Sequence, residues 1–66
     1  MIPKTKEIKI RMIDLQLKQN DLAEQLGLTK IYVNALINGR ETSWRQAYRL
    51  SKCLGGTIDD YFTVED

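Results

Sequence analysis

The fold is decided by residues 19–39, which read QNDLAEQLGLTKIYVNALING. Apolar side chains recur at helical spacing over about 19–26 and again over about 30–37. Between these runs, Gly27 tolerates the left-handed backbone that ends a helix, and Thr29 is a natural N-cap for the next helix. The stretch therefore predicts two short helices joined by a tight turn.

The small and branched residues of this stretch stand where two crossing helices need them. Ala23 is small enough to let the helices approach, Gly27 allows the turn, and Val33 and Leu36 pin the second helix against the first. Such a pair is a helix-turn-helix, in which the second helix is offered to the major groove of DNA. We expect this motif over about residues 19–38.

A helical pattern precedes the motif, after Pro3 and Thr5. Its apolar residues fall on two faces, Ile8, Met12 and Leu15 on one and Ile10, Ile13 and Leu17 on the other. Because such a helix is apolar around much of its girth, we expect it to be the most buried helix of the domain.

Two further helices are predicted after the motif. Asn38 and Gly39 both accept positive φ and end the third helix. Ser43 with Gln46 is typical of a capping box and opens a fourth helix. The side chains of that helix expected to face inward are Ala47, Leu50, Ser51 and Leu54.

A short fifth helix follows the Gly55-Gly56 pair. Thr57 with Asp60 resembles another capping box, and the apolar residues after it are Ile58, Tyr61 and Phe62. Strand signals are weak, and the last few residues are expected to fray. The prediction is a compact all-α domain of five helices, with residues 1–66 as a single domain and its core over about 6–62.

Composition excludes several classes of function. The chain has 66 residues, no His and a single Cys, Cys53, which is expected to be a small buried or half-buried residue. A Ser/His/Asp or Cys/His triad, an internal disulfide and a Cys/His zinc site are therefore impossible. The sequence contains neither an apolar run of about 18 residues nor a secretory signal. We expect an intracellular domain without cofactor, metal or small-molecule ligand, and not an enzyme; the Asp59-Asp60 pair is explained by helix capping.

Charge is unevenly distributed although the net charge is only +1. Residues 30–52 hold five Lys or Arg against one Glu, whereas residues 53–66 hold four acidic residues and no basic ones. Ordinary solvated helix faces would explain this pattern. Taken with the motif, the basic middle indicates a surface for a polyanion.

The stretch and its flanks resemble the phage repressor and Cro-like (lambda repressor-like, XRE-type) helix-turn-helix family. The matching flanks are Leu17, the sequence Asn38-Gly39-Arg40, Leu50 with Leu54-Gly55, and Ile58-Asp59, so the resemblance covers about residues 6–62. It implies a five-helix, all-α domain that binds double-stranded operator DNA. Family members usually bind a palindromic site as a two-fold dimer. Because the expected partner is DNA, the resemblance also implies a cytoplasmic, nucleoid-associated protein.

The resemblance also implies which residues contact base edges, namely Thr29, Lys30, Ile31, Asn34 and Ala35. Lys30 can donate to guanine, and Asn34 can pair with adenine or reach a phosphate. Ile31 and Ala35 can pack on thymine methyl groups. The alternative is that these residues are only the exposed side of an amphipathic helix, although an exposed Ile31 beside Lys and Asn suits a binding face.

Phosphate contacts are implied for Gln19, Tyr32, Asn38, Arg40, Arg45 and Lys18. Gln19 opens the second helix, whose dipole favours an anion. For Asn38, the alternative interpretation as a plain C-cap of the third helix has nearly the same weight as a phosphate contact. For Arg49 and Lys52, further along the fourth helix, exposure to solvent is expected.

The chain departs from the family pattern at three places. Met12 and Ile37 replace an Arg–Glu ion pair found in many members, and we expect the two side chains to be buried in contact. Lys18 stands where a Ser or Asn cap is common, and lysine has no acceptor with which to cap. Trp44 is expected to be a core or hydrophobic anchor, or else a contact beside the phosphate clamp.

The leading function is a sequence-specific transcriptional regulator, a phage or bacterial Cro/repressor-like protein that acts by occupying its operator. Tyr61, Phe62 and Val64 lie near where family members often dimerise, although Phe62 is more simply a core residue. The tail is short, so the homodimer is expected to be weak or induced by DNA. The alternative function is an antitoxin or other partner-binding module, which an exposed apolar patch would favour.

Overall fold

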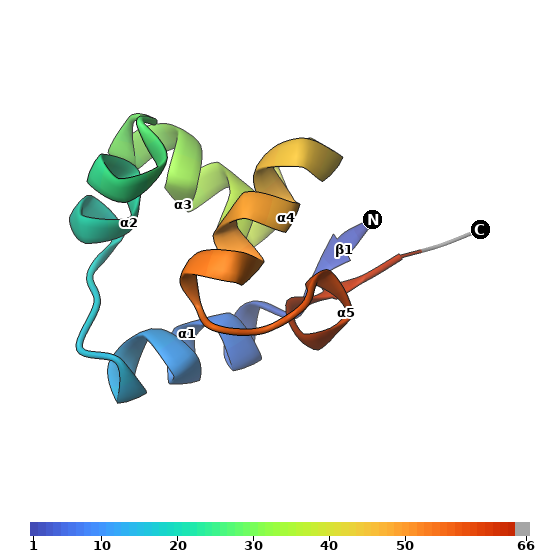
Figure 1. The fold of residues 1–66 in the computed structure, drawn as a ribbon. Coiled ribbons are helices and arrows are strands. Elements are labelled where there is room, and N and C mark those ends of the chain that lie inside the picture. The colour runs from blue at the N-terminus through green and yellow to red at the C-terminus, as the bar shows by residue number, and fades with distance from the viewer. Residues whose placement is uncertain (65–66) are drawn as a thin grey trace.

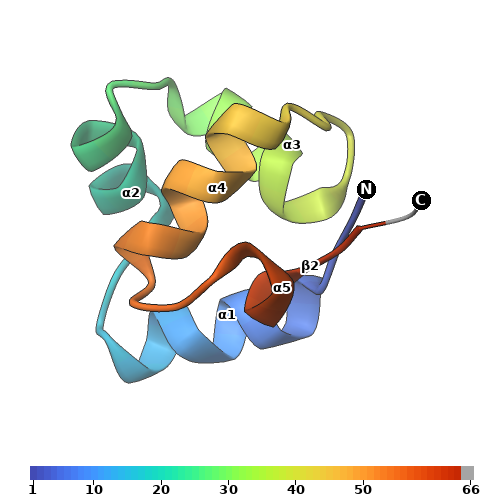
Figure 2. The ribbon, with the colours of Figure 1, turned by 45° about the vertical axis from the view of Figure 1, so that its right-hand side comes forward.

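Five helices and two short strands make up the computed structural model, which describes residues 1–64 (Figure 1). In chain order these are β1 (Ile2–Pro3), α1 (Thr5–Asp14), α2 (Gln19–Leu26), α3 (Lys30–Asn38), α4 (Trp44–Cys53), α5 (Ile58–Tyr61) and β2 (Phe62–Thr63). In both views α1 lies along the bottom with α2 and α3 above it, and α4 packs against α2 and α5 (Figures 1 and 2). The predicted all-α class and five-helix architecture are confirmed.

The predicted helix ends agree closely with the structure. Gly27 follows α2 with φ of 69°, and Gly39 follows α3 with φ of 86°. Thr29 caps α3 by accepting a hydrogen bond from the backbone N–H of Tyr32 at 3.1 Å. Asn38 is the last helical residue and Gly39 the C-cap, so the interpretation of Asn38 as a plain C-cap is wrong.

The capping box predicted at the start of α4 forms only in part. The hydroxyl of Ser43 accepts from the backbone N–H of Gln46 at 3.4 Å. The side chain of Gln46 does not complete the box, and its Oε1 accepts a hydrogen bond from Arg49 instead. At α5 the prediction holds, since the backbone N–H of Thr57 donates to the Asp60 carboxylate at 2.8 Å.

Helix α1 is much less buried than its two apolar faces suggest. Only Ile8 and Met12 are buried on it, while Ile13 is 75% exposed and Ile10 is exposed as well. The helix packs on α3 and α5 with one face, and it lies at the edge of the bundle, where nothing covers the other face (Figures 1 and 2). The prediction that this is the most buried helix is therefore wrong.

A pair of very short strands joins the two ends of the chain. Ile2 pairs with Thr63 and Pro3 with Phe62 in an antiparallel arrangement. Strands of two residues are too short to give the alternating pattern that predicts a strand. Of the last few residues, which were expected to fray, Thr63 is held in this pairing, and residues 65–66 lie outside the described part of the chain.

The core collects the inward faces of all five helices. Its buried side chains include the four predicted for α4, and Cys53 packs against it half-buried, as expected. Met12 is 7% exposed and Ile37 is fully buried, and both belong to the same hydrophobic cluster. Their predicted burial is confirmed, while their direct contact stays a prediction. Tyr61 and Phe62 also close this core.

Side chains from neighbouring elements satisfy carbonyl groups near the ends of three helices. Arg49 Nη2 donates to the Leu26 oxygen at the end of α2 at 2.8 Å. Arg11 Nε donates to Leu54 at the end of α4 at 2.9 Å. Thr5 Oγ1 donates to Ile37 in the last turn of α3 at 2.6 Å. Since orphan carbonyls at helix ends need partners, these bonds fix how the helices meet.

Two residues of α4 were expected in solvent, and only one of them is there. Arg49 is half-buried and holds α2 and Gln46, so the expectation is wrong for it. Lys52 is exposed, with its ammonium nitrogen 5.4 Å from the centre of the Tyr48 ring.

Candidate nucleic-acid interface

Helices α2 and α3 meet as the motif predicts. Ala23 is buried on α2, and Val33 and Leu36 are fully buried on α3. The backbone N–H of Leu28 donates to the oxygen of Ala23 and closes the turn at 2.9 Å. A Cβ at Gly27 would meet no atom within 4 Å, so the positive φ, and not a lack of space, requires glycine here.

The outward face of α3 carries the residues predicted to contact bases. Ile31 is 81% exposed and lies opposite the buried side of the helix, which is formed by Val33, Leu36 and Ile37. Lys30 and Thr29 are exposed at the start of the same helix, and Ala35 is half-buried one turn after Ile31. These four side chains therefore share one accessible surface at the N-terminal part of α3.

Asn34 lies beside this surface and connects several of the predicted site residues. Its Nδ2 donates to Gln19 Oε1 at 3.2 Å, and its Oδ1 accepts a hydrogen bond from Arg40 Nη2. Its backbone oxygen accepts from Asn38 Nδ2 at 2.9 Å. A base contact by Asn34 would have to use the second hydrogen of Nδ2 and the second lone pair of Oδ1, or else replace the bonds to Gln19 and Arg40.

The start of α2 holds two residues predicted to contact phosphate. Lys18 is the exposed residue before the helix, and its backbone N–H donates to the Asp21 carboxylate at 2.8 Å. Its side chain makes no capping bond, as expected for lysine. Gln19 is half-buried against Asn34. The Asp21 carboxylate thus satisfies one donor at this end of α2.

The other predicted phosphate contacts follow α3 or flank it. Arg40 lies just beyond the helix, where its backbone N–H donates to the Ala35 oxygen at 2.9 Å. Arg40, Asn38 and Arg45 are exposed, and Tyr32 is half-buried on the flank of α3. Arg40 thus places a cation just beyond the end of α3, while Lys30 places one at its start.

Trp44 does not occupy the core. It is 51% exposed, because the buried face of α4 begins one turn later, at Ala47. With Tyr48, which is 47% exposed, and with Arg45 and Arg49 it lines an open hollow of about 420 Å³. The core role predicted for Trp44 is therefore wrong, and the contact beside the phosphate clamp stays a prediction.

Sequence reasoning missed the link between Asn34 and its two side-chain partners. Gln19 and Arg40 stand 15 positions before and six positions after Asn34. Neither spacing is a helical neighbour relationship, since one crosses the turn and the other the loop after α3. The packing of α2 against α3 reveals the first bond, and the path of the chain beyond α3 reveals the second.

Two further features to consider within residues 1–64 are a metal site and a membrane-spanning helix. No group of three His, Cys, Asp or Glu residues in this range could hold a metal ion. The same range contains no helix with the length and apolar character needed to cross a membrane.

The chain matches a family model described as Helix-turn-helix over residues 8–61. The matched span runs from α1 to α5 and includes the whole α2–α3 pair. Comparisons with curated proteins and with solved structures find no match.

Proposed function

The chain belongs to the lambda repressor-like helix-turn-helix family, and on this premise we propose that it is a sequence-specific transcriptional regulator that acts by occupying an operator. The family is one of DNA-binding regulators of transcription. Occupancy of a promoter by a small domain excludes other proteins from it and needs no catalytic group. The proposed place of action is the nucleoid, in the cytoplasm.

The observation that carries this proposal is the accessible surface at the start of α3. Ile31 is 81% exposed and stands directly after Lys30, so both side chains are free to contact a partner from the outward face of α3. A thymine methyl group and a guanine edge are matching partners for these two side chains in the major groove. We assign base contacts to Lys30, Ile31, Thr29 and Ala35.

Phosphate contacts on either side would set the position of α3 in the groove. The proposed groups are Lys18 and Gln19 at the start of α2, and Tyr32, Asn38, Arg40 and Arg45 around α3 and the start of α4. Contacts of this kind position a protein on the duplex and make its affinity depend on salt.

We propose that binding is two-fold, by a weak or DNA-induced homodimer on a palindromic operator. Tyr61 and Phe62 are buried in the core, which leaves Val64 and Ile2 as the exposed apolar residues at this end of the described chain. A surface of so few apolar side chains suits an association that DNA has to complete.

Selection of bound duplexes from a random pool at moderate salt tests the function. Enrichment of a palindrome whose half-sites lie about one helical turn apart is the expected result. Selection with Lys30→Ala in parallel should lose preference at one base position of each half-site. Absence of any enriched sequence would contradict the proposal.

A second candidate function is partner binding, because α4 exposes Trp44 and Tyr48 together. Exposed aromatic side chains are enriched where proteins associate. On this hypothesis, the double substitution Trp44→Ser, Tyr48→Ser would abolish association with a protein partner. The duplex selection would give no enriched sequence with the unchanged chain or with any variant. An enriched operator for the unchanged chain would favour the first function.

A further inference from the structure

Asn34 uses both polar atoms of its side chain within the protein. The Nδ2 group is committed to Gln19 at the start of α2, and Oδ1 is committed to Arg40 beyond the end of α3. An asparagine that reads adenine offers these same two atoms to the base. The side chain is also half-buried, whereas Ile31 on the same helix is 81% exposed.

The placement of Asn34 around α3 agrees with this commitment. Lys30, Asn34 and Asn38 are four residues apart and form a stripe along the helix. Asn34 lies on the side of this stripe that meets α2, because its amide reaches Gln19 there. It therefore borders the surface centred on Ile31.

The direction of hydrogen bonding fixes what the two partners present to solvent. Gln19 accepts from Asn34 through Oε1, so its NH₂ group is left as the outward donor. A phosphate oxygen can only accept, and this is the orientation that it requires. Arg40 donates to Asn34 with one nitrogen and keeps further N–H donors for a phosphate.

We propose that Asn34 is a positioning residue, which holds Gln19 and Arg40 in the geometry for two phosphate contacts and reads no base. The inference rests on the proposed DNA-binding function. Hydrogen bonds run in one direction, from Arg40 to Asn34 and from Asn34 to Gln19, and members of such a chain polarise one another. Ordering the two side chains before binding lowers the entropy lost on binding.

The positioning part is tested on the free protein by ¹⁵N relaxation of side-chain N–H groups. In the unchanged chain, the Arg40 Nε–H and the Gln19 NH₂ should be ordered, and Asn34→Ala should make both mobile. Asn34→Asp keeps an acceptor for Arg40 but has no donor for Gln19, so only Gln19 should become mobile. The proposal would be overturned if the Arg40 group had the same mobility in all three proteins and the Gln19 group did too.

The DNA part is tested with the selected operator and its single-base variants. Asn34→Ala should weaken binding to all of them by one common factor, on the order of threefold to tenfold for the loss of one or two hydrogen bonds. In a Gln19→Ala, Arg40→Ala background it should cause no further loss. Loss of preference at a single base pair, as expected for Lys30→Ala, would overturn the proposal.

The two tests separate this inference from the function on which it rests. If the unchanged chain enriches no duplex, the proposed function is contradicted, while side-chain relaxation still decides whether Asn34 orders Gln19 and Arg40. If the operator is enriched and Asn34→Ala alters one base preference, the function stands and the positioning role is overturned. Thermal unfolding of each variant confirms that the proteins compared are folded.

Discussion

The guanidinium of Arg49 donates to the backbone oxygen of Leu26 at 2.8 Å, and so joins α4 to the last residue of α2. The same guanidinium donates to Gln46 Oε1 at 2.8 Å. A cation at a helix C-terminus also interacts favourably with the helix dipole. Arg49 therefore holds the helix-turn-helix pair against the rest of the domain.

Arg49→Ala should lower the free energy of unfolding by about 1.5–3 kcal/mol, the range for hydrogen bonds made by a charged group. Urea unfolding followed by circular dichroism measures the change. Arg45→Ala is the matched control, because Arg45 lies one turn earlier on the same helix and is exposed. Its effect should stay within about 0.5 kcal/mol. Equal stability of the two variants would contradict the role of Arg49.

Gly27→Ala should destabilise the domain by about 1–2 kcal/mol, because an L-residue with a Cβ is strained in the left-handed region. The cost comes from the backbone alone, since a Cβ at this position would meet no atom within 4 Å. Gly27→Asn should cost less, because asparagine tolerates this region better. Thermal unfolding ranks the three proteins, and an alanine variant as stable as the unchanged chain would be the contrary result.

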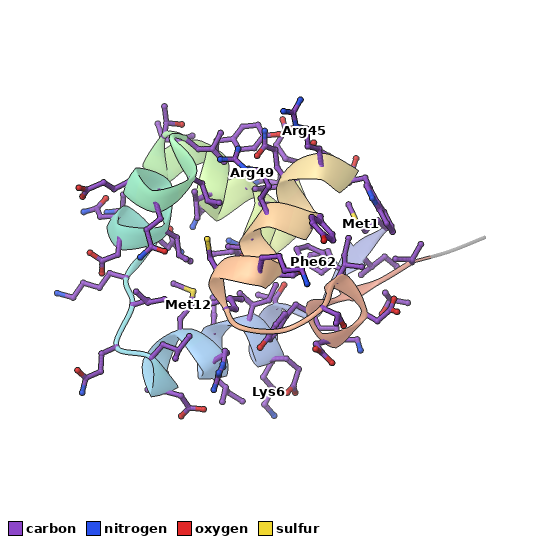
Figure 3. The ribbon with its side chains drawn as sticks, in the orientation of Figure 1. Met1, Lys6, Met12, Arg45, Arg49 and Phe62 are labelled. Carbon is purple, nitrogen blue, oxygen red and sulfur yellow. The ribbon has the colours of Figure 1, made fainter. Side chains whose placement is uncertain are left out.

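Lys18→Ala should reduce the slope of log affinity against log salt by about one unit, as expected when one phosphate contact is lost. Lys6→Ala is the control, since Lys6 lies on α1, on the side of the molecule away from α2 and α3 (Figure 3). Its slope should not change. Titration of the selected operator at several salt concentrations provides both slopes, and an unchanged slope for Lys18→Ala removes that residue from the interface.

Acid should weaken the start of α5. Hydrogen bonds from the backbone N–H and the hydroxyl of Thr57 lower the pKa of Asp60 below its ordinary value. A lowered folded-state pKa gives stability that is present above the unfolded-state pKa and is lost as the pH falls through the folded-state pKa. The unchanged chain should therefore melt higher than Asp60→Asn at pH about 6, and the difference should shrink as the pH falls below the ordinary aspartate pKa of about 4.

Melting curves of both proteins across this pH range make the comparison. Asp59→Asn removes a charge from the same turn without removing either of the bonds from Thr57. It should therefore show a smaller difference from the unchanged chain. A gap for Asp60→Asn that stays constant down to pH about 2 would be inconsistent with the lowered pKa.

Local patterns predicted most of this fold because most of its helix ends depend on nearby residues. Thr29, Gly27 and Gly39 act on their own turns, and each was predicted from its own chemistry. The burial of Met12 and Ile37 was also predictable, since both are apolar at positions where the family has an ion pair. The helix ends need no knowledge of which helices become neighbours, whereas the burial of Met12 and Ile37 was inferred from a pairing known in the family.

The errors concern features that depend on distant neighbours. Ile13 has the same apolar character as Ile8, and only the position of α1 at the edge of the bundle leaves it 75% exposed. Arg49 finds its acceptor 23 residues earlier in the chain. Trp44 precedes the buried part of α4 by one turn. Sequence periodicity carries no signal for where another helix begins or ends.

The central claim is that the start of α3 is the DNA-reading surface. Titration of the ¹⁵N-labelled protein with the selected operator, followed by backbone amide shifts, tests this claim most directly. The largest changes should fall on Lys30, Ile31 and Ala35, with smaller ones at the start of α2. Changes confined to Trp44 and Tyr48 on α4, or to the exposed face of α1, would contradict it.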